Sequence, residues 1–400
     1  MQEALEGVKV LDFSQLLQGP YATQMMGDLG ADIIKIERNG SGDIYRAMTF
    51  LNKWIAKDES PCFMAWNRNK RSLSIDIKSE EGKEVIYKLA KEADVLVENF
   101  RPGVMARLGF GYEDIKKINP SIIYCSASGW GADGPYLDRP GQDLLVQSIS
   151  GATMTSGKKN DGPIVLGTAL CDQVNGLNSV YAILSALYYR EKTGKGQEIK
   201  TNLLSSAIAF QMQDFFALQN LQTSYVRPES KIGHPGNGAP FGTYKTSDGY
   251  LAIAMNPWPK LVEALGEDAL MKYNDSQILY DKRDKIHAEI EAVTVTKTTD
   301  EWLDIMLELD LWVAKVLDQT EVEHDPQVIH NNTFVEVEHP KAGKVKVTNI
   351  PFTMSETPGR IKRPSPMLGE HGEEILKEIG LNQLEIQELI NRNIVTVERR

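Results

Sequence analysis

An alternation of short β-branched segments with helical segments over the first 130 residues most constrains the fold of this 400-residue chain. Apolar runs with the length and composition of buried strands lie at residues 8–13, 32–37, 72–77, 94–98 and 121–126. Helical patterns separate these runs, among them residues 20–29 and 79–91. A strand followed by a helix and another strand predicts a parallel sheet covered by helices. The predicted fold class is therefore α/β, in the doubly wound arrangement.

A segment rich in proline and glycine at residues 223–242 is the best candidate for a linker or mobile loop. A long apolar helix at 171–192 and a strand at 196–203 precede it, and the strand patterns FVEVEH and KVKVTN follow in the tail. A chain of this length is long enough for two domains. The predicted parts are a large domain from 1–225, a smaller α+β domain from 226–328, and a C-terminal part, 329–400, that rejoins the large domain.

The charge and cysteine content argue against several classes of protein. The 55 acidic residues outnumber the 44 Lys and Arg residues, for a net charge of −11, whereas a general nucleic-acid binder needs a basic surface. The three cysteines are far apart and form no Cys-x-x-Cys pair, so we expect no disulfide framework and no metal site. The start of the chain has no signal-peptide pattern and no apolar run approaches ~18 residues. We therefore expect a cytoplasmic protein with neither a membrane span nor a nucleic-acid partner.

Residues 129–134 match the pattern G-x-G-x-x-G and follow a predicted strand. A dinucleotide site also needs a helix that opens at once, so that its N-terminal amides meet the pyrophosphate. Here the turn-forming segment PYLDRP, at 135–140, follows instead. We interpret these glycines as part of a turn and expect no nucleotide cofactor.

Polar and cationic residues stand at the ends of successive predicted strands. Arg38 closes the second strand, Lys78 follows the third, and Asn99 and Arg101 follow the fourth. The carboxyl ends of parallel strands meet at one edge of a sheet, where ligands bind in such folds, so this edge suits a phosphorylated ligand. A solvated Lys or Arg at a strand end is also commonplace, and that interpretation stays open.

Asp172 stands at the start of the long apolar helix and has two interpretations. From the residues alone the favoured one is a helix N-cap, a position that Asp prefers. In the other, the positive end of the helix holds the carboxylate ionised and reactive, and a carboxylate nucleophile is a known route to covalent catalysis. Among the six histidines, His234 in the loop rich in proline and glycine is the one that could touch a ligand.

Several longer segments resemble a known family. They are FSQLLQGPYATQMMGDLGADIIKIE, NRNKRSLSIDIKSEEG, ADVLVENFRPGVMARLGF, INPSIIYCSASGWGADGP, GTALCDQVNG and LGEHGEEILKEIG. These segments occur in the same order in family III CoA-transferases, the CaiB/BaiF type, and the resemblance covers nearly the whole chain. GSGD at 40–43 and NPWPKL at 256–261 look nearest to the formyl-CoA:oxalate CoA-transferase branch.

The resemblance implies a fold, a set of site residues and an assembly. The fold would be an interlocked homodimer in which each chain forms a Rossmann-like large domain and a small domain. Asp172 would be the nucleophile. The implied CoA contacts are Leu17, Gln18, Arg38, Ile75, Asp76, Ile77, Lys78, Asn99, Phe100, Arg101 and Arg107. The implied substrate-binding residues are Met48, which stands where the formyl-CoA enzymes carry a tryptophan, Gln142, Asp143, and the glycine loop of Gly236, Asn237 and Gly238, which would cover the acyl site.

The implied reaction moves CoA from an acyl-CoA thioester to a free carboxylic acid through an aspartyl anhydride and an aspartyl-CoA thioester. Formyl-CoA or acetyl-CoA with oxalate is one such pair, and coenzyme A is the only cofactor expected. One alternative on the same scaffold is an acyl-CoA racemase, but that branch carries a histidine at position 142, where this chain has glutamine. Another alternative is a CoA-binding protein without activity, which would not need Asp172.

Overall fold

The computed structural model describes residues 2–398, and these form two compact units. The first unit contains the chain up to Val146, residues 169–210, and the chain from Pro326 onward. The second unit contains residues 147–168 and 211–325. It therefore includes residues 147–168 and 211–225 in addition to most of the range 226–328.

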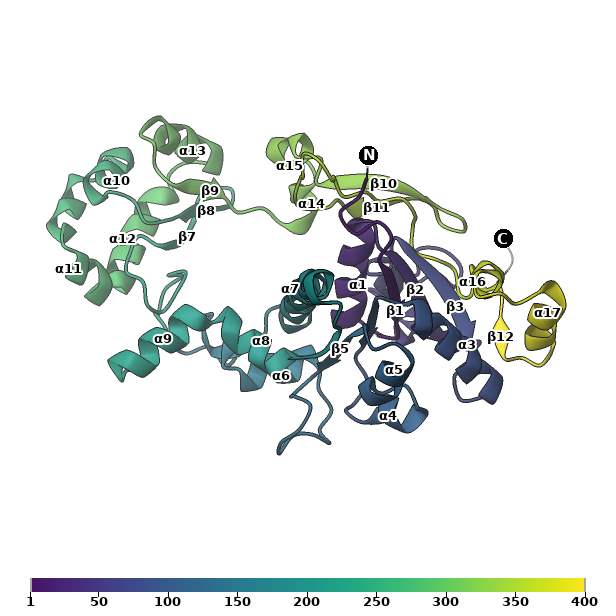
Figure 1. The fold of residues 1–400 in the computed structure, drawn as a ribbon. Helices are drawn as coiled ribbons and strands as arrows, with labels where there is room; N and C mark the ends of the chain where they lie inside the picture. The colour runs from purple at the N-terminus through teal and green to yellow at the C-terminus, as the bar shows by residue number, and fades with distance from the viewer. Residues whose placement is uncertain (1, 399–400) are drawn as a thin grey trace. The chain divides into compact units, whose positions relative to one another are not determined.

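A seven-stranded sheet forms the centre of the first unit, in the order β12-β3-β2-β1-β4-β5-β6 (Figure 1). Its strands are β1 (Lys9–Asp12), β2 (Asp32–Arg38), β3 (Lys70–Ile75), β4 (Val95–Glu98), β5 (Ile123–Ser128), β6 (Gln197–Asn202) and β12 (Val395–Thr396). All neighbours are parallel except β12, which pairs antiparallel with β3. The predicted α/β fold with a parallel sheet is confirmed. Each of the six predicted strands is present, with bounds within about two residues of those expected.

Helices cover both faces of this sheet (Figure 1). The helices of the first unit are α1 (Gln18–Asp28), α2 (Pro61–Met64), α3 (Glu80–Glu92), α4 (Val104–Leu108), α5 (Tyr112–Ile118), α7 (Leu170–Thr193), α8 (Leu203–Phe210), α15 (Pro326–His330), α16 (Gly372–Glu378) and α17 (Gln383–Asn391). Helix α6 (Asp143–Ile149) begins in this unit, and a 3₁₀ helix, η1, spans Ile44–Ala47. The two strands predicted in the tail are present as β10 (Phe334–His339) and β11 (Gly343–Thr348), and they pair as an antiparallel hairpin. Within residues 2–398, no helix has the length and apolar character needed to cross a membrane.

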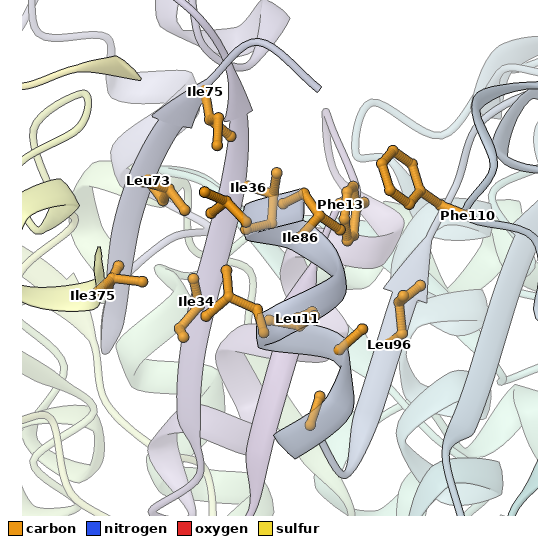
Figure 2. Packing of buried hydrophobic residues seen from close by; sticks show 14 of the residues in the cluster. Leu11, Phe13, Ile34, Ile36, Leu73, Ile75, Ile86, Leu96, Phe110 and Ile375 are labelled. Carbon is orange, nitrogen blue, oxygen red and sulfur yellow. The ribbon is translucent and has the colours of Figure 1, made fainter. Parts of the chain in front are cut away.

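Alternate side chains of the central strands pack into two separate cores. Leu11 and Leu96 belong to the core formed with α3, α5, α16 and α17, where Ile86 of α3 lies over them (Figure 2). Val10 and Val95, from the same strands, belong to the core formed with α1 and α7. Because both faces are buried, consecutive residues in the middle of these strands are apolar.

The long helix α7 agrees closely with the helix expected at 171–192. It ends at Gly194, whose backbone is left-handed with φ of 70° and whose N–H donates to the carbonyl of Arg190 at 2.7 Å. Glycine adopts this conformation without the steric cost of a Cβ atom, so Gly194 is a suitable C-cap for α7.

The second unit contains a three-stranded antiparallel sheet of β7 (Gly242–Lys245), β8 (Tyr250–Ile253) and β9 (Val313–Lys315). The predicted turn at residues 247–249 joins β7 to β8. Helices pack around a core that includes Trp302, Tyr244 and Leu251. The helical elements are η2 (Ala152–Met154), α9 (Met212–Leu221), α10 (Trp258–Leu265), η3 (Asp268–Tyr273), α11 (Ser276–Asp281), α12 (Arg283–Thr294), α13 (Thr299–Glu308) and α14 (Gln319–Val322).

The strand order of the large sheet reverses direction between β1 and β4. From β1 the chain adds β2 and β3 on one side, and then returns to add β4, β5 and β6 on the other. At such a reversal the connections leave in opposite directions and open a crevice beyond the carboxyl ends of the strands. This crevice is where the candidate site lies.

Candidate active site

A cavity of about 850 Å³ runs along the carboxyl ends of β1, β2, β3 and β4. Its lining includes Arg38 and Phe100, the segment Ile75–Lys78, and the apolar residues Val104 and Leu108 of α4. Its volume falls in the range of about 300–1,000 Å³ that is usual for ligand pockets. The structure therefore brings together, at one edge of the sheet, six residues that were expected to contact CoA.

A smaller hollow of about 150 Å³ lies at the carboxyl ends of β4 and β5 and shares Phe100 with the first cavity. Gln18, Asn99 and Arg101 line it. The other two expected CoA contacts lie outside both linings. Leu17 is buried directly before α1, and Arg107 lies in the last turn of α4.

The turn between β1 and α1 is held by Asn99. The Gln15 N–H donates to Asn99 Oδ1 at 2.8 Å, and Asn99 Nδ2 donates back to the Gln15 carbonyl at 2.7 Å. The next residue, Leu16, has a left-handed backbone with φ of 65°. The Asn99 amide thus serves to shape the turn at the mouth of the site, a role that was not expected for it.

Asp172 is the third residue of α7 and does not cap the helix. The N-cap position belongs to Ala169, which makes no side-chain capping bond. The Asp172 N–H instead donates to Oδ2 of Asp143, the first residue of α6, at 3.1 Å. The favoured interpretation of Asp172 as a cap is therefore wrong, and the carboxylate that accepts from this helix end is Asp143.

Two effects raise the pKa of Asp172 from 3.8 to about 7. The larger is burial, which disfavours the charged form, and the second is the negative charge of Asp143. The helix N-terminus was expected to hold Asp172 ionised, so that expectation is wrong in direction. A carboxyl group with this pKa changes protonation state near neutral pH.

The charges of Asp143 and Asp172 also affect the pKa values of Tyr45 and Cys171. Burial, followed by the charge of Asp172, raises the pKa of Tyr45 to about 12, so its phenol stays protonated. Burial, followed by the charges of Asp143 and Asp172, raises the pKa of Cys171 to about 12. Since the thiolate is the reactive form of cysteine, the Cys171 thiol is a poor nucleophile here.

The remaining expected substrate residues of the first unit are exposed. Met48 directly follows the 3₁₀ helix η1 that carries Tyr45, and its side chain is 43% exposed. Gln142 is exposed and directly precedes α6. Tyr45 was missed in the sequence because no spacing links it to Asp172, which lies far away along the chain.

The glycine loop lies in the second unit and is held by its own histidine. The Gly236 N–H donates to Nδ1 of His234 at 3.0 Å, and Nε2 of His234 lies 2.8 Å from Oδ1 of Asp214. Tyr225 also donates its hydroxyl to Asp214 Oδ1, at 2.5 Å. Because Nδ1 accepts a hydrogen bond, Nε2 carries the proton and donates to Asp214. Both ring nitrogens of His234 therefore form hydrogen bonds, one within the loop and one with Asp214 of α9.

Gly238 is required by close packing in the same loop. A Cβ atom there would lie 2.8 Å from the carbonyl carbon and oxygen of Leu279. Asn237 is held from the other side, because its carbonyl accepts from Nη1 of Arg283 at 3.3 Å. The loop thus has a defined shape at both ends.

The glycines at 129–134 form a turn, as predicted, and the next helix begins only at Asp143. A Cβ atom on Gly129 would lie 2.5 Å from the Cα atom of Gly141. The close approach of these two backbones brings the segment before Asp143 onto the end of β5. The pattern is therefore part of the turn that leads to Asp143.

Comparison with known proteins gives matches over nearly the whole chain. Residues 5–372 match the model of CoA-transferase family III. The human succinyl-CoA:glutarate CoA-transferase is 34% identical over 98% of this chain and 90% of its own length. A formyl-CoA:oxalate CoA-transferase of Bradyrhizobium sp. (strain ORS 278) is also 34% identical, over 97% of this chain and 96% of its own. The crystal structure of a CAIB/BAIF family protein from Brucella suis superposes with a TM-score of 0.85 at 32% identity, covering 95% of this chain and 100% of that one.

Proposed function

This chain belongs to CoA-transferase family III, and from that premise we propose that it moves CoA from an acyl-CoA thioester to a free carboxylic acid with Asp172 as the nucleophile. The observation that carries the proposal is the Asp172 carboxyl group, partly buried in the first turn of α7 beside Asp143. A desolvated carboxylate with a pKa near 7 is a stronger nucleophile than one in water and is still ionised in half or more of the molecules at neutral pH.

The first half of the reaction forms a covalent intermediate with the donor. A carboxylate oxygen of Asp172 attacks the thioester carbonyl, the carbon–sulfur bond breaks, and CoA leaves as the thiolate. The thiolate then attacks the Asp172 carboxyl carbon of the mixed anhydride. This step releases the donor acid and leaves an aspartyl-CoA thioester.

The second half repeats these steps in reverse with the acceptor. The acceptor carboxylate attacks the aspartyl-CoA thioester, and CoA again leaves as the thiolate. The thiolate attacks the acceptor's carbonyl carbon in the new anhydride, which forms the new acyl-CoA and returns Asp172 as a carboxylate. The anhydride is hydrolysed by water, so the site must exclude water around Asp172.

The cavity along the sheet edge would hold the CoA moiety. Arg38 and Lys78 line it, and Arg101 lines the adjoining hollow. Three cationic side chains suit the phosphates of CoA, and the apolar part of the lining suits its pantetheine arm. Binding would place the thioester at the reversal between β1 and β4, close to the turn that Asn99 shapes.

The acids exchanged would be small carboxylic acids. Relatives named for oxalate and for glutarate match this chain at the same identity of 34%. The exposed Met48 would border the acyl site, with the loop of Gly236, Asn237 and Gly238 as its cover. Formyl-CoA or acetyl-CoA with oxalate, and succinyl-CoA with glutarate, are the first pairs to test.

The enzyme would act as an interlocked homodimer. In support, one side of α7 carries three large apolar residues that are exposed in the single chain: Leu177 at 50%, Tyr181 at 75% and Tyr188 at 65%. Their spacing of four and seven residues puts them on one face of the helix. An exposed apolar stripe of this kind marks an interaction surface. Light scattering should give a particle of about twice the 44.7 kDa chain mass.

A panel of acyl-CoA donors and carboxylate acceptors, read by mass spectrometry, tests the activity. Asp172→Ala should abolish transfer, while Asp304→Ala, which removes an exposed carboxylate on α13, should not change it. Incubation with acyl-CoA and hydroxylamine should convert Asp172 to a hydroxamate. Full activity of Asp172→Ala would contradict the proposed role.

A further inference from the structure

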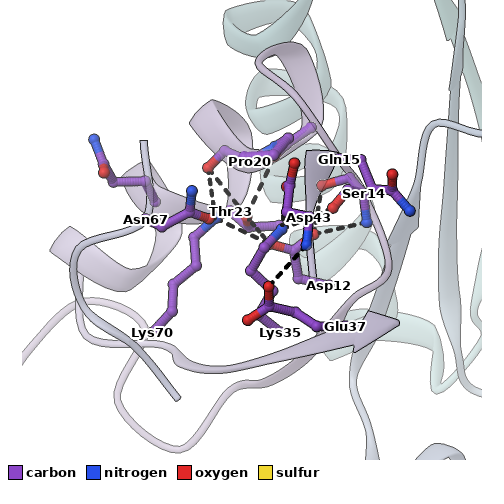
Figure 3. A network of polar contacts seen from close by, with 12 residues as sticks. Asp12, Ser14, Gln15, Pro20, Thr23, Lys35, Glu37, Asp43, Asn67 and Lys70 are labelled. Carbon is purple, nitrogen blue, oxygen red and sulfur yellow. Dashed lines mark hydrogen bonds and ion pairs between the residues drawn. The ribbon is translucent and has the colours of Figure 1, made fainter. Parts of the chain in front are cut away.

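Four charged side chains form a fully buried network beneath the turn between β1 and α1 (Figure 3). Lys70 Nζ lies 3.0 Å from Asp12 Oδ2, and Lys35 Nζ lies 4.0 Å from the same oxygen. Lys35 Nζ also lies 3.0 Å from Asp43 Oδ2 and donates to the Ser14 carbonyl at 2.8 Å. The network therefore links three strands of the sheet to the loop that contains Asp43.

A buried ionic network is costly to desolvate and is weak evidence of a stabilising role. Apolar side chains of similar volume often give equal or better stability at such positions. The network can, however, hold the groups that are bonded to it in a fixed geometry.

The second oxygen of Asp43 accepts from two backbone N–H groups that lie far apart along the chain. Leu16 donates to Oδ1 at 3.1 Å, and Tyr45 donates to the same atom at 2.9 Å. The Asp43 N–H is itself held by Oε2 of Glu37, at 3.0 Å. Asp43 thus joins the turn at the mouth of the cavity to the 3₁₀ helix η1, which carries Tyr45.

Leu16 needs such support because its backbone is strained. Its φ of 65° lies in the left-handed region, which leucine avoids because its Cβ atom crowds the following carbonyl. Its side chain is 39% exposed, so packing in the core does not account for the conformation. The bond from its N–H to Asp43 holds Leu16 there, and α1 with Gln18 begins two residues later.

Tyr45 depends on Asp43 in a different way. Asp43 is the N-cap of the 3₁₀ helix η1, and its bond to the Tyr45 N–H starts that helix. The helix therefore orients Tyr45 and Met48, the residue that directly follows η1. The charge of Asp172 contributes to the raised pKa of the Tyr45 phenol.

We propose that Asp43 is a positioning residue that, fixed by Lys35, sets both the strained Leu16 turn used for CoA binding and the 3₁₀ helix that carries Tyr45 and leads to Met48. The roles of the Leu16 turn in CoA binding and of the Tyr45 helix in turnover rest on the proposed function. Their common anchor follows from the hydrogen bonds. Loss of Asp43 should therefore impair CoA binding through Leu16 and turnover through Tyr45.

A matched pair of double variants tests this. In K35M/D43N the buried ion pair is gone, but the Asn oxygen still accepts from Leu16 and Tyr45. In K35M/D43L the charges change in the same way and the acceptor is lost. Titration with free CoA should give a dissociation constant about tenfold higher for K35M/D43L than for K35M/D43N, since the Leu16 turn loses the hydrogen bond that holds it. Equal constants and equal kcat values for the two variants would overturn the proposal.

A third variant separates the two effects. Adding L16G to K35M/D43L should recover about fivefold in CoA affinity, because glycine adopts the left-handed conformation without strain. It should not recover kcat, since the Tyr45 N–H still lacks its acceptor. This split is not expected from a purely structural role. Failure of L16G to improve CoA binding would contradict the role assigned to Leu16.

If the double variants do not fold, amide hydrogen exchange on the wild-type protein tests whether the Leu16 and Tyr45 amides are hydrogen-bonded. The Leu16 and Tyr45 amides should both be protected, although Leu16 lies in a turn. Exchange of the Leu16 amide at the rate of an unstructured chain would overturn the proposal. CoA titration and amide exchange require no acyl transfer. They therefore test the role of Asp43 even if the proposed acyl transfer proves wrong.

Discussion

The backbone N–H of Asp172 donates to the carboxylate of Asp143 at 3.1 Å, across 29 residues of sequence. One carboxylate therefore caps the helix whose first turn carries the other. Because Asp172 is partly withdrawn from water and lies close to the negative charge of Asp143, it holds its proton more tightly than an ordinary aspartate. This relationship controls when the candidate nucleophile is ionised.

The rate of transfer should depend on pH through Asp172. Its raised pKa of about 7 means that the reactive carboxylate is depleted as the pH falls below neutrality. We expect kcat/KM for acyl-CoA to level off above pH ~7 and to fall about tenfold for each pH unit below it. A profile that stays flat from pH 5 to pH 8 would contradict this pKa.

Replacing Asp143 with Asn should shift that profile to lower pH. The change removes the negative charge beside Asp172, while an oxygen remains that can accept from the Asp172 N–H. Burial, the larger cause of the raised pKa, is unchanged, so we expect a shift of about one unit or less. The measurement is kcat/KM against pH for the wild type and for D143N. A shift to higher pH would show that Asp143 does not act through its charge.

Asp172→Asn should stabilise the folded protein at alkaline pH. The folded pKa of about 7 lies above the unfolded value near 3.8, so the folded state binds the extra proton and wild-type stability falls as the pH rises between these values. The Asn variant lacks this loss. At pH 8 its free energy of unfolding should exceed that of the wild type by up to about 4 kcal/mol, with a smaller difference at pH 5. Urea denaturation at the two pH values measures it, and a gain that is equal at both would be inconsistent with titration of Asp172.

His234→Ala should loosen the glycine loop. The variant removes the acceptor of the Gly236 N–H and the partner of Asp214. If the loop covers the acyl site, water should reach the anhydride, and the ratio of acyl-CoA hydrolysis to transfer should rise about tenfold or more. The affinity for free CoA should stay the same. His324→Ala, which removes an exposed histidine of the same unit, is the control. An unchanged ratio in His234→Ala would argue against the loop as a cover.

The central sheet could be predicted because each strand has a local signature. Runs such as DIIKIE are short, β-branched and bounded by helical segments, and these properties determine β2 without reference to the rest of the chain. The cap of α7 at Gly194 was likewise a local property. The cationic residues at the sheet edge could be predicted because the alternation of strands and helices makes the strands parallel, so that their carboxyl ends meet at one edge.

The environment of Asp172 could not be predicted in the same way. Its position as the third helical residue depends on where α7 starts, and helix ends are the least certain part of a sequence-based assignment. Its partner Asp143 lies 29 residues away, and no spacing rule relates them. The direction of the pKa shift of Asp172 depends on burial by residues from other elements. Lys35 and Lys70 look like ordinary polar positions within strands, yet both are fully buried in the structure.

Isotope transfer from the acceptor tests the proposed mechanism most directly. In the last step the acceptor's bridging oxygen stays on Asp172 when CoA attacks the acceptor carbonyl. Turnover with an acceptor acid labelled with ¹⁸O should therefore place ¹⁸O in the side chain of Asp172. Mass spectrometry of the peptide containing Asp172 should show a gain of about 2 Da for each oxygen exchanged. Turnover that leaves this peptide unlabelled would contradict the role of Asp172 as the nucleophile.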